Sequence, residues 1–177
     1  MITIKTIDVE LALMRHFDFR QNLIVPNITN MVWTLAFETD MLVLTKSGYA
    51  HGFEIKVSKS DLNADFKKPQ HCKFEEIKNG KSGLERYYGK FKYFSYAVPH
   101  DLKDYALTVI PEFCGLYSVK NTYLDINRFP YVRLECIRNP KELFRYKWSD
   151  KERYEIARLG AMRIYGLKQK LNKRVLL

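Results

Sequence analysis

The sequence contains no long hydrophobic run. Its longest apolar stretch, Met31 to Phe37, is interrupted by Thr34 and is far shorter than the roughly 20 residues that a membrane-spanning helix needs. The opening residues, MITIKTIDVE, lack the basic flank, apolar core and small-residue cleavage site of an export signal. We therefore expect no membrane segment and a cytoplasmic protein.

Cysteine is also scarce. The three cysteines, Cys72, Cys114 and Cys136, are widely spaced, which argues against a disulfide framework and against a zinc knuckle. We expect them to be reduced thiols in or near the core.

Acidic residues are few relative to basic ones. The chain of 177 residues has 20 Asp and Glu against 30 Lys and Arg, which gives a formal net charge of +10. This excess favours a polyanionic partner, with nucleic acid first and an anionic membrane surface second. With 46% hydrophobic residues, the length suits one globular domain over residues 1–177 with a full core.

The hydrophobic pattern predicts helices alternating with strands. Apolar residues recur at helical spacing from Thr6 to Phe17, and Asp61 to Lys68 is also helical in pattern. Short runs rich in Val, Leu and aromatic residues predict strands at 22–26, 31–45, 49–57, 92–98, 115–119 and 131–137. The stretch 73–89 is polar and contains three glycines. This alternation indicates a mixed α/β domain around one sheet.

A basic helix is predicted at the C-terminal end, over about residues 149–172. Ser149 and Glu152 form the S-x-x-E capping box that typically begins a helix. From Lys141 to Leu177 there are 11 basic and 4 acidic residues. The helix therefore presents either a solvated charged face or a surface that contacts phosphates.

Two strands that flank a short turn carry the most informative residues. If Lys46, Ser47 and Gly48 form a three-residue loop with Gly48 in the left-handed conformation, the numbers of paired residues add to 94. Asp40 then lies opposite Glu54, on the same face as Lys56. A two-residue loop would instead place Asp40 and Glu54 on opposite faces of the sheet.

Two facing carboxylates, with Cβ atoms roughly 5 Å apart, repel each other unless a positive charge lies between them. Mg²⁺ prefers carboxylate and carbonyl oxygens, and the Ile55 carbonyl is a further candidate ligand. Lys56 would hold the attacking water, as metal-assisted hydrolysis of a phosphodiester requires. The structural alternative is a pattern of exposed charges on a solvated sheet face.

The segments ETDMLVLTKSGYAHGFEIKVSKSDLNADFKK, KYFSYAVPHDL and IPEFCGLYSV resemble the PD-(D/E)xK nuclease superfamily, in particular its small phage and DNA-repair branch with the MmcB-like repair proteins. The resemblance implies a central mixed β-sheet flanked by helices, with a restriction-endonuclease-like core. It also implies a DNA nuclease that depends on Mg²⁺ or Mn²⁺ and acts in DNA repair, recombination or phage DNA processing. By this resemblance Asp40 and Glu54 are metal ligands, Lys56 is the catalytic lysine, and Glu10 is a helix-borne acid near the ion. Thr39 replaces the Pro of the motif, and 73–89 resembles an insertion.

Basic residues near the motif are the predicted DNA contacts, some of them interleaved with aromatic residues that could stack on bases. They are Lys59, Lys67, Lys68, Arg86, Lys90 and Lys92. Two other functions stay open: a DNA-binding module that keeps the nuclease fold without cutting, and RNA binding or cleavage. A homodimer is also open.

Overall fold

The computed structural model describes residues 3–28, 35, 37–68, 84–123 and 130–175. Its helices are α1 (Thr6–His16), α2 (Lys59–Asp65), α4 (Leu84–Tyr88), the 3₁₀ turn η1 (His100–Leu102), α5 (Lys103–Val109) and α6 (Asp150–Val175). Its strands are β1 (Leu23–Ile28), β2 (Thr39–Leu44), β3 (Ala50–Ile55), β4 (Tyr93–Pro99), β5 (Gly115–Tyr123) and β6 (Pro130–Arg138).

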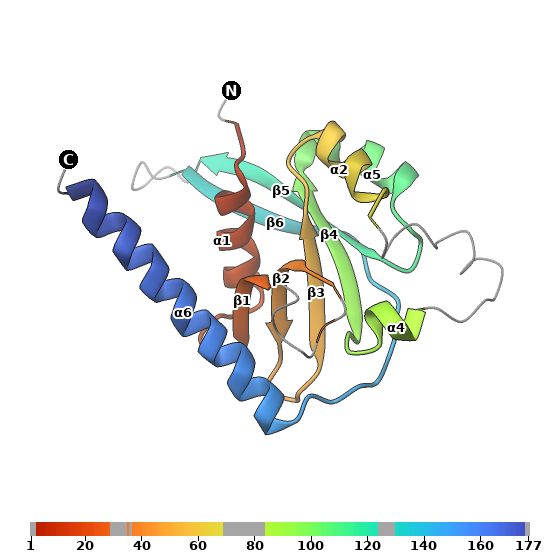
Figure 1. Cartoon of the computed structure of the whole chain (residues 1–177). Coiled ribbons are helices and arrows are strands. Elements are labelled where there is room, and N and C mark those ends of the chain that lie inside the picture. The colour runs from red at the N-terminus through yellow and green to blue at the C-terminus, as the bar shows by residue number, and fades with distance from the viewer. Residues whose placement is uncertain (1–2, 29–34, 36, 69–83, 124–129, 176–177) are drawn as a thin grey trace.

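The six strands form one sheet in chain order, β1-β2-β3-β4-β5-β6 (Figure 1). The central strands β3, β4 and β5 run parallel to one another, and the other neighbouring pairs are antiparallel. Helical connections after β3 and β4 allow this parallel arrangement. The predicted α/β class, a mixed sheet flanked by helices, is confirmed.

The alternation of side chains along the strands gives the sheet two buried faces. On one face, Val9 and Leu13 of α1 pack with odd-numbered strand residues such as Phe53. On the other face, residues of α2, α4, α5 and α6 pack with even-numbered strand residues such as Leu42 and Tyr96. In β2 to β5 the odd-numbered residues therefore meet α1 and the even-numbered residues meet the other helices, whereas in β6 and in the first residues of β1 this parity is reversed.

The hairpin between β2 and β3 has the predicted three-residue loop. Gly48 adopts a φ of +87°, and its N–H donates to the Thr45 carbonyl over 2.9 Å. Met41 pairs with Phe53, and Leu42 pairs with Gly52, so the paired numbers add to 94. The predicted register is confirmed.

Several boundaries differ from the sequence-based expectation. β2 begins at Thr39, so Leu35 and Phe37 are outside the strand expected at 31–45, although both are buried in the core. Glu38 is exposed and also lies outside the strand. Much of the 73–89 segment, namely 73–83, lies outside the described residues. The C-terminal end of this segment forms the helix α4. Tyr88 of α4 is fully buried in the core, although the sequence predicted a polar segment here.

The C-terminal helix α6 begins where the capping box predicts it. The Ser149 hydroxyl and backbone N–H both donate to the Glu152 carboxylate, and the Glu152 N–H donates back to the Ser149 oxygen. Ile156 of α6 is buried in the core, beside β1. Within the described residues, no helix combines the length and the apolar composition needed to cross a membrane.

Candidate functional site

Asp40 and Glu54 converge near the end of β3. One step beyond the Met41 and Phe53 pair, the two carboxylates lie opposite each other on the face that also meets α2. The Glu54 side chain is 1% exposed, and the Asp40 side chain is 36% exposed. The site is therefore buried on one side and open to solvent on the other.

The ammonium group of Lys56 lies between these carboxylates. Its Nζ is 2.5 Å from Glu54 Oε2 and 3.4 Å from Asp40 Oδ2. The Lys56 side chain is 4% exposed, so this is not the exposed charge pattern of a solvated sheet face. Asp40, Glu54 and Lys56, which sequence analysis placed on one face, are in contact in the structure.

Asp40 is held in place by the backbone of β3. The Ile55 N–H donates to Asp40 Oδ2 over 2.8 Å, and the Thr39 hydroxyl donates to the Phe53 carbonyl over 2.9 Å. The Lys56 N–H points the other way, towards Ala97 of β4. Because N–H and C=O of one extended residue point to the same side, the Ile55 carbonyl oxygen is directed to the side of β2 and Asp40.

Helix α2 adds a third carboxylate that sequence analysis did not select as a site residue. Asp65 is fully buried; its Oδ1 lies 3.1 Å from Lys56 Nζ and 2.6 Å from Lys68 Nζ. The Tyr96 hydroxyl donates to Asp65 Oδ2 over 3.0 Å. The Ser58 side chain caps α2 just after β3. We call Asp40, Glu54, Lys56, Asp65 and Lys68 the charged cluster.

Burial and charge imbalance set the electrostatics of the charged cluster. Three carboxylates share two ammonium groups, of which Lys68 is 44% exposed. Burial and then the Asp40 charge raise the pKa of Glu54 to about 8, against the opposing effect of Lys56. The neighbouring carboxylates overcome burial and raise the pKa of Lys56, so its ammonium group stays protonated at neutral pH. With all three carboxylates ionised, the cluster would have one more negative than positive group.

Glu10 approaches Asp40 from α1. Burial raises the pKa of Glu10, and the Asp40 charge also contributes to this rise. The Asn27 side chain donates to Glu10 Oε1 over 3.5 Å. The predicted helix-borne acid is therefore within electrostatic range of Asp40.

The oxygen donors at the site suit a hard divalent cation that takes only a few of its ligands from the protein. Among the described residues, no group of three or more His, Cys, Asp or Glu side chains is arranged to hold a metal ion. Mg²⁺ commonly uses only one or two carboxylates and keeps several waters. Asp40, Glu54 and the Ile55 carbonyl are all oxygen donors, and burial followed by the Asp40 charge raises the pKa of Glu54 to about 8.

The predicted DNA contacts are divided between two ends of the sheet. Lys59 and Lys67 are exposed at the two ends of α2, and Lys68 belongs to the charged cluster. Lys92 lies instead at the start of β4, where its N–H donates to the carbonyl of Ala50, the first residue of β3.

Lys90 belongs to that second end as well. Its Nζ pairs with Glu152 at 2.5 Å, and its carbonyl accepts from the Trp148 indole. The Arg86 side chain lies outside the described part of the structure. Lys90 and Lys92 therefore do not share a surface with the charged cluster, and no single basic patch joins all the predicted contacts that the structure describes.

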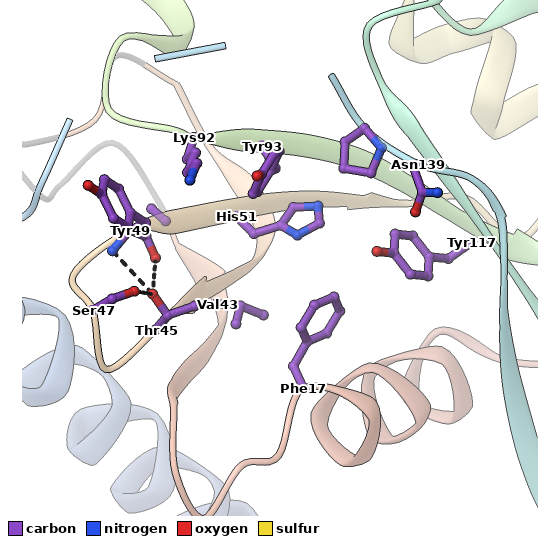
Figure 2. Close-up of a pocket in the computed structure, with 12 residues that line it drawn as sticks. Phe17, Val43, Thr45, Ser47, Tyr49, His51, Lys92, Tyr93, Tyr117 and Asn139 are labelled. Atoms are coloured by element: carbon purple, nitrogen blue, oxygen red, sulfur yellow. Dashed lines mark hydrogen bonds between the residues drawn. The ribbon is translucent and has the colours of Figure 1, made fainter. Parts of the chain in front are cut away.

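A pocket of about 490 Å³ lies near the hairpin, lined by Phe17 of α1, His51 and Tyr117 among others (Figure 2). The odd-numbered His51 faces α1, the opposite face from Glu54. Its Nε2 bonds the Ser95 hydroxyl at 2.7 Å, and burial lowers its pKa to about 3. His51 is a neutral, hydrogen-bonded core histidine, separate from the charged cluster.

Comparison with known proteins adds information on the fold. No family model matches the chain, and no curated protein matches it. A solved structure, the SPO1766 protein of unknown function from Silicibacter pomeroyi, is similar with a TM-score of 0.52. The two chains are 16% identical, and the match covers 93% of this chain and 88% of that one. At this identity the likeness shows a shared fold.

Proposed function

We propose that this protein is a metal-dependent DNA nuclease that hydrolyses phosphodiester bonds. The observation that carries the proposal is the convergence of the Asp40 and Glu54 carboxylates on the buried ammonium group of Lys56, at a partly solvent-exposed position where β2 begins and β3 ends. A divalent ion, Mg²⁺ or Mn²⁺, fits the oxygen donors of Asp40, Glu54 and Ile55.

The residues of the site would divide the chemistry among them. A bound divalent ion would lower the pKa of a coordinated water and offset charge developing on the phosphate. Lys56 remains protonated, so it would orient the attacking water and stabilise negative charge by donating hydrogen bonds rather than by accepting a proton. Asp65 would fix the position of Lys56, and Glu10 would add negative charge beside Asp40.

The proposal that the substrate is DNA rests on the positive charge of the protein. The chain carries a net charge of +10, and two lysines that flank the charged cluster along the chain are exposed, Lys59 at the start of α2 and Lys67 just after its end. Lysine side chains there would contact backbone phosphates without reading sequence. The pathway that fits the motif is DNA repair, recombination or phage DNA processing.

One observation favours the alternative of a non-catalytic DNA-binding module. Lys56 and Lys68 already form ion pairs with Glu54, so the charged cluster has an internal source of positive charge. In such a module the cluster would support the fold, and DNA binding would need no metal.

The test incubates the full chain with linear, nicked, branched and single-stranded DNA, with and without Mn²⁺. Asp40→Asn is the decisive variant, because its amide oxygen can still accept from the Ile55 N–H while the charge is lost. The matched control is Glu38→Gln, which changes an exposed carboxylate outside the strand. We expect Mn²⁺-dependent cleavage that Asp40→Asn abolishes and Glu38→Gln retains.

Full cleavage by Asp40→Asn would refute the proposed site. Calorimetric titration with Mn²⁺ separates the two functions, because a nuclease should bind Mn²⁺ in a manner that depends on Asp40. DNA binding without such uptake and without cleavage would establish the non-catalytic module. Parallel reactions with matched RNA strands test the polymer class.

A further inference from the structure

The pocket near the hairpin has no part in the proposed nuclease site (Figure 2). Its volume of about 490 Å³ lies within the range of about 300–1,000 Å³ that is typical of small-molecule sites. Val43 and Tyr117, which line it, pack on the α1 side of the sheet, whereas the charged cluster lies on the other side. The pocket is therefore able to take a ligand of its own.

Aromatic rings line the pocket at both ends. At one end, Phe17 and Tyr117 have ring centroids 5.9 Å apart, and both rings contact that of His51. Tyr49 and Tyr93 line the pocket at the other end. Figure 2 shows the His51 ring between the two ends. Because aromatic rings stack well on flat π-systems, this lining favours a planar aromatic ligand.

Lys92 gives the pocket its charge. Its ammonium group lies 4.6 Å from the centroid of the Tyr49 ring and 5.4 Å from that of the Tyr93 ring. Of the described residues that line the pocket, Lys92 is the only one with a charge at neutral pH, since none is acidic and His51 is neutral. The lining therefore complements an anionic group at the end that holds Tyr49 and Tyr93.

The present partner of Lys92 is an exchangeable one. Glu142 lies outside the pocket lining, 3.4 Å from Lys92 Nζ, and the two side chains are 34% and 23% exposed. Glu142 also pairs with Arg145. It would therefore keep a cationic partner if Lys92 turned to a ligand.

Uncharged polar groups complete the lining. The hydroxyls of Thr45 and Ser47 lie 2.9 Å apart in the hairpin, and Tyr117 and Asn139 add a hydroxyl and an amide. Hydroxyl and amide groups both donate and accept hydrogen bonds. Nucleobases present the same mixture of donors and acceptors along their edges.

We infer that this pocket binds a single nucleotide, with the base among the aromatic side chains and the phosphate at Lys92. The nucleotide is either free or an unpaired residue of a single strand. This inference goes beyond the proposed nuclease function and needs neither a metal ion nor the charged cluster. It also gives a role to Lys92, which does not share a surface with that cluster.

The test is calorimetric titration of the full chain in EDTA, so that metal-dependent cleavage does not interfere. The probes are deoxyadenosine monophosphate, deoxyadenosine and inorganic phosphate. We expect one site per chain for the monophosphate, and about tenfold weaker binding of deoxyadenosine, which lacks the anion. No saturable binding of the monophosphate in the millimolar range would overturn the inference, and so would equally tight binding of phosphate alone.

Two variants separate the phosphate from the base. Lys92→Met should weaken binding of the monophosphate about tenfold and leave that of deoxyadenosine unchanged. Tyr93→Leu should weaken binding of both ligands by the same factor, about fivefold or more, because stacking is lost. An unchanged affinity in either variant would overturn the placement of the nucleotide.

Lys141→Met is the matched control for Lys92→Met. Lys141 lies outside the pocket lining and also pairs with a glutamate, Glu112, at 3.8 Å. Equal losses in the two variants would mean that only net charge matters and would overturn the inference. Circular dichroism verifies that all three variants are folded.

A single-stranded deoxyadenosine hexamer identifies the source of the nucleotide. If the hexamer displaces the monophosphate and Lys92→Met weakens its binding, the pocket takes an unpaired base of a strand. If the monophosphate stays bound in excess hexamer, the pocket takes the free nucleotide. Either result supports the inference and assigns one source.

Discussion

Replacing Lys56 with methionine should destabilise the metal-free protein, because it removes a buried ammonium group from among three carboxylates. Lys56 Nζ lies 2.5 Å from Glu54, 3.1 Å from Asp65 and 3.4 Å from Asp40. Methionine keeps much of the side-chain volume, so lost charge rather than a cavity dominates the change.

The size of the effect follows from what remains. Removing one partner of a buried ion pair typically costs about 3–5 kcal/mol. Lys68 still contacts Asp65 at 2.6 Å and Glu54 at 3.4 Å, and Asp40 is partly solvated. We therefore expect a loss near the lower limit, about 3 kcal/mol, which for a chain of this size lowers Tm by about 6–12 °C.

Urea and thermal unfolding followed by circular dichroism measure the loss. Lys59→Met is the control, because Lys59 is exposed and its ammonium group lies 4.0 Å over the Tyr105 ring. That variant should lose less than about 1 kcal/mol. If Lys56→Met loses no more than Lys59→Met, the ammonium group does not hold the carboxylates together and our account of the site is wrong.

Three further predictions concern pH and the start of α6. The raised pKa of Glu54 means that the folded protein holds a proton that the unfolded chain releases, so the free energy of unfolding should fall as pH rises from about 4.5 to about 8. Unfolding midpoints across this window should vary less in Glu54→Gln. His51 has the opposite dependence: because its pKa is lowered to about 3, the free energy of unfolding should fall as pH decreases from about 6.5. His51→Gln, which leaves the partner Ser95 unchanged, should lose this dependence in acid titrations followed by fluorescence. Ser149→Ala removes the cap of α6 and should cost about 1 kcal/mol in urea unfolding; an unchanged midpoint would mean that the capping box does not stabilise the helix.

The hairpin is where sequence reasoning was most successful. Gly48 fixed the loop length, and loop length fixed the register that brings Asp40 opposite Glu54. The capping box likewise predicted the start of α6 at Ser149. Both are local signals, in which a few adjacent residues determine the backbone geometry.

Contacts between distant segments were less predictable. Asp65 lies three residues after the buried Leu62, so helical spacing places it on the inner face of α2, and this signal could have identified it. Its pairing with Lys56 depends on how α2 packs against β3, which no local pattern specifies. The same limit applies to Lys90 and Lys92: aromatic neighbours suggested one DNA surface, but strand direction placed them at the far end of the sheet.

The charged cluster draws all its members from residues 40–68, a hairpin followed directly by one helix. Short chain segments separate these groups, so bringing them together demands little loop-closure entropy. On the ribosome, this stretch emerges well before α6, and its partners are near neighbours along the nascent chain. Assembly of the charged cluster can therefore begin early in biosynthesis, before α6 is synthesised.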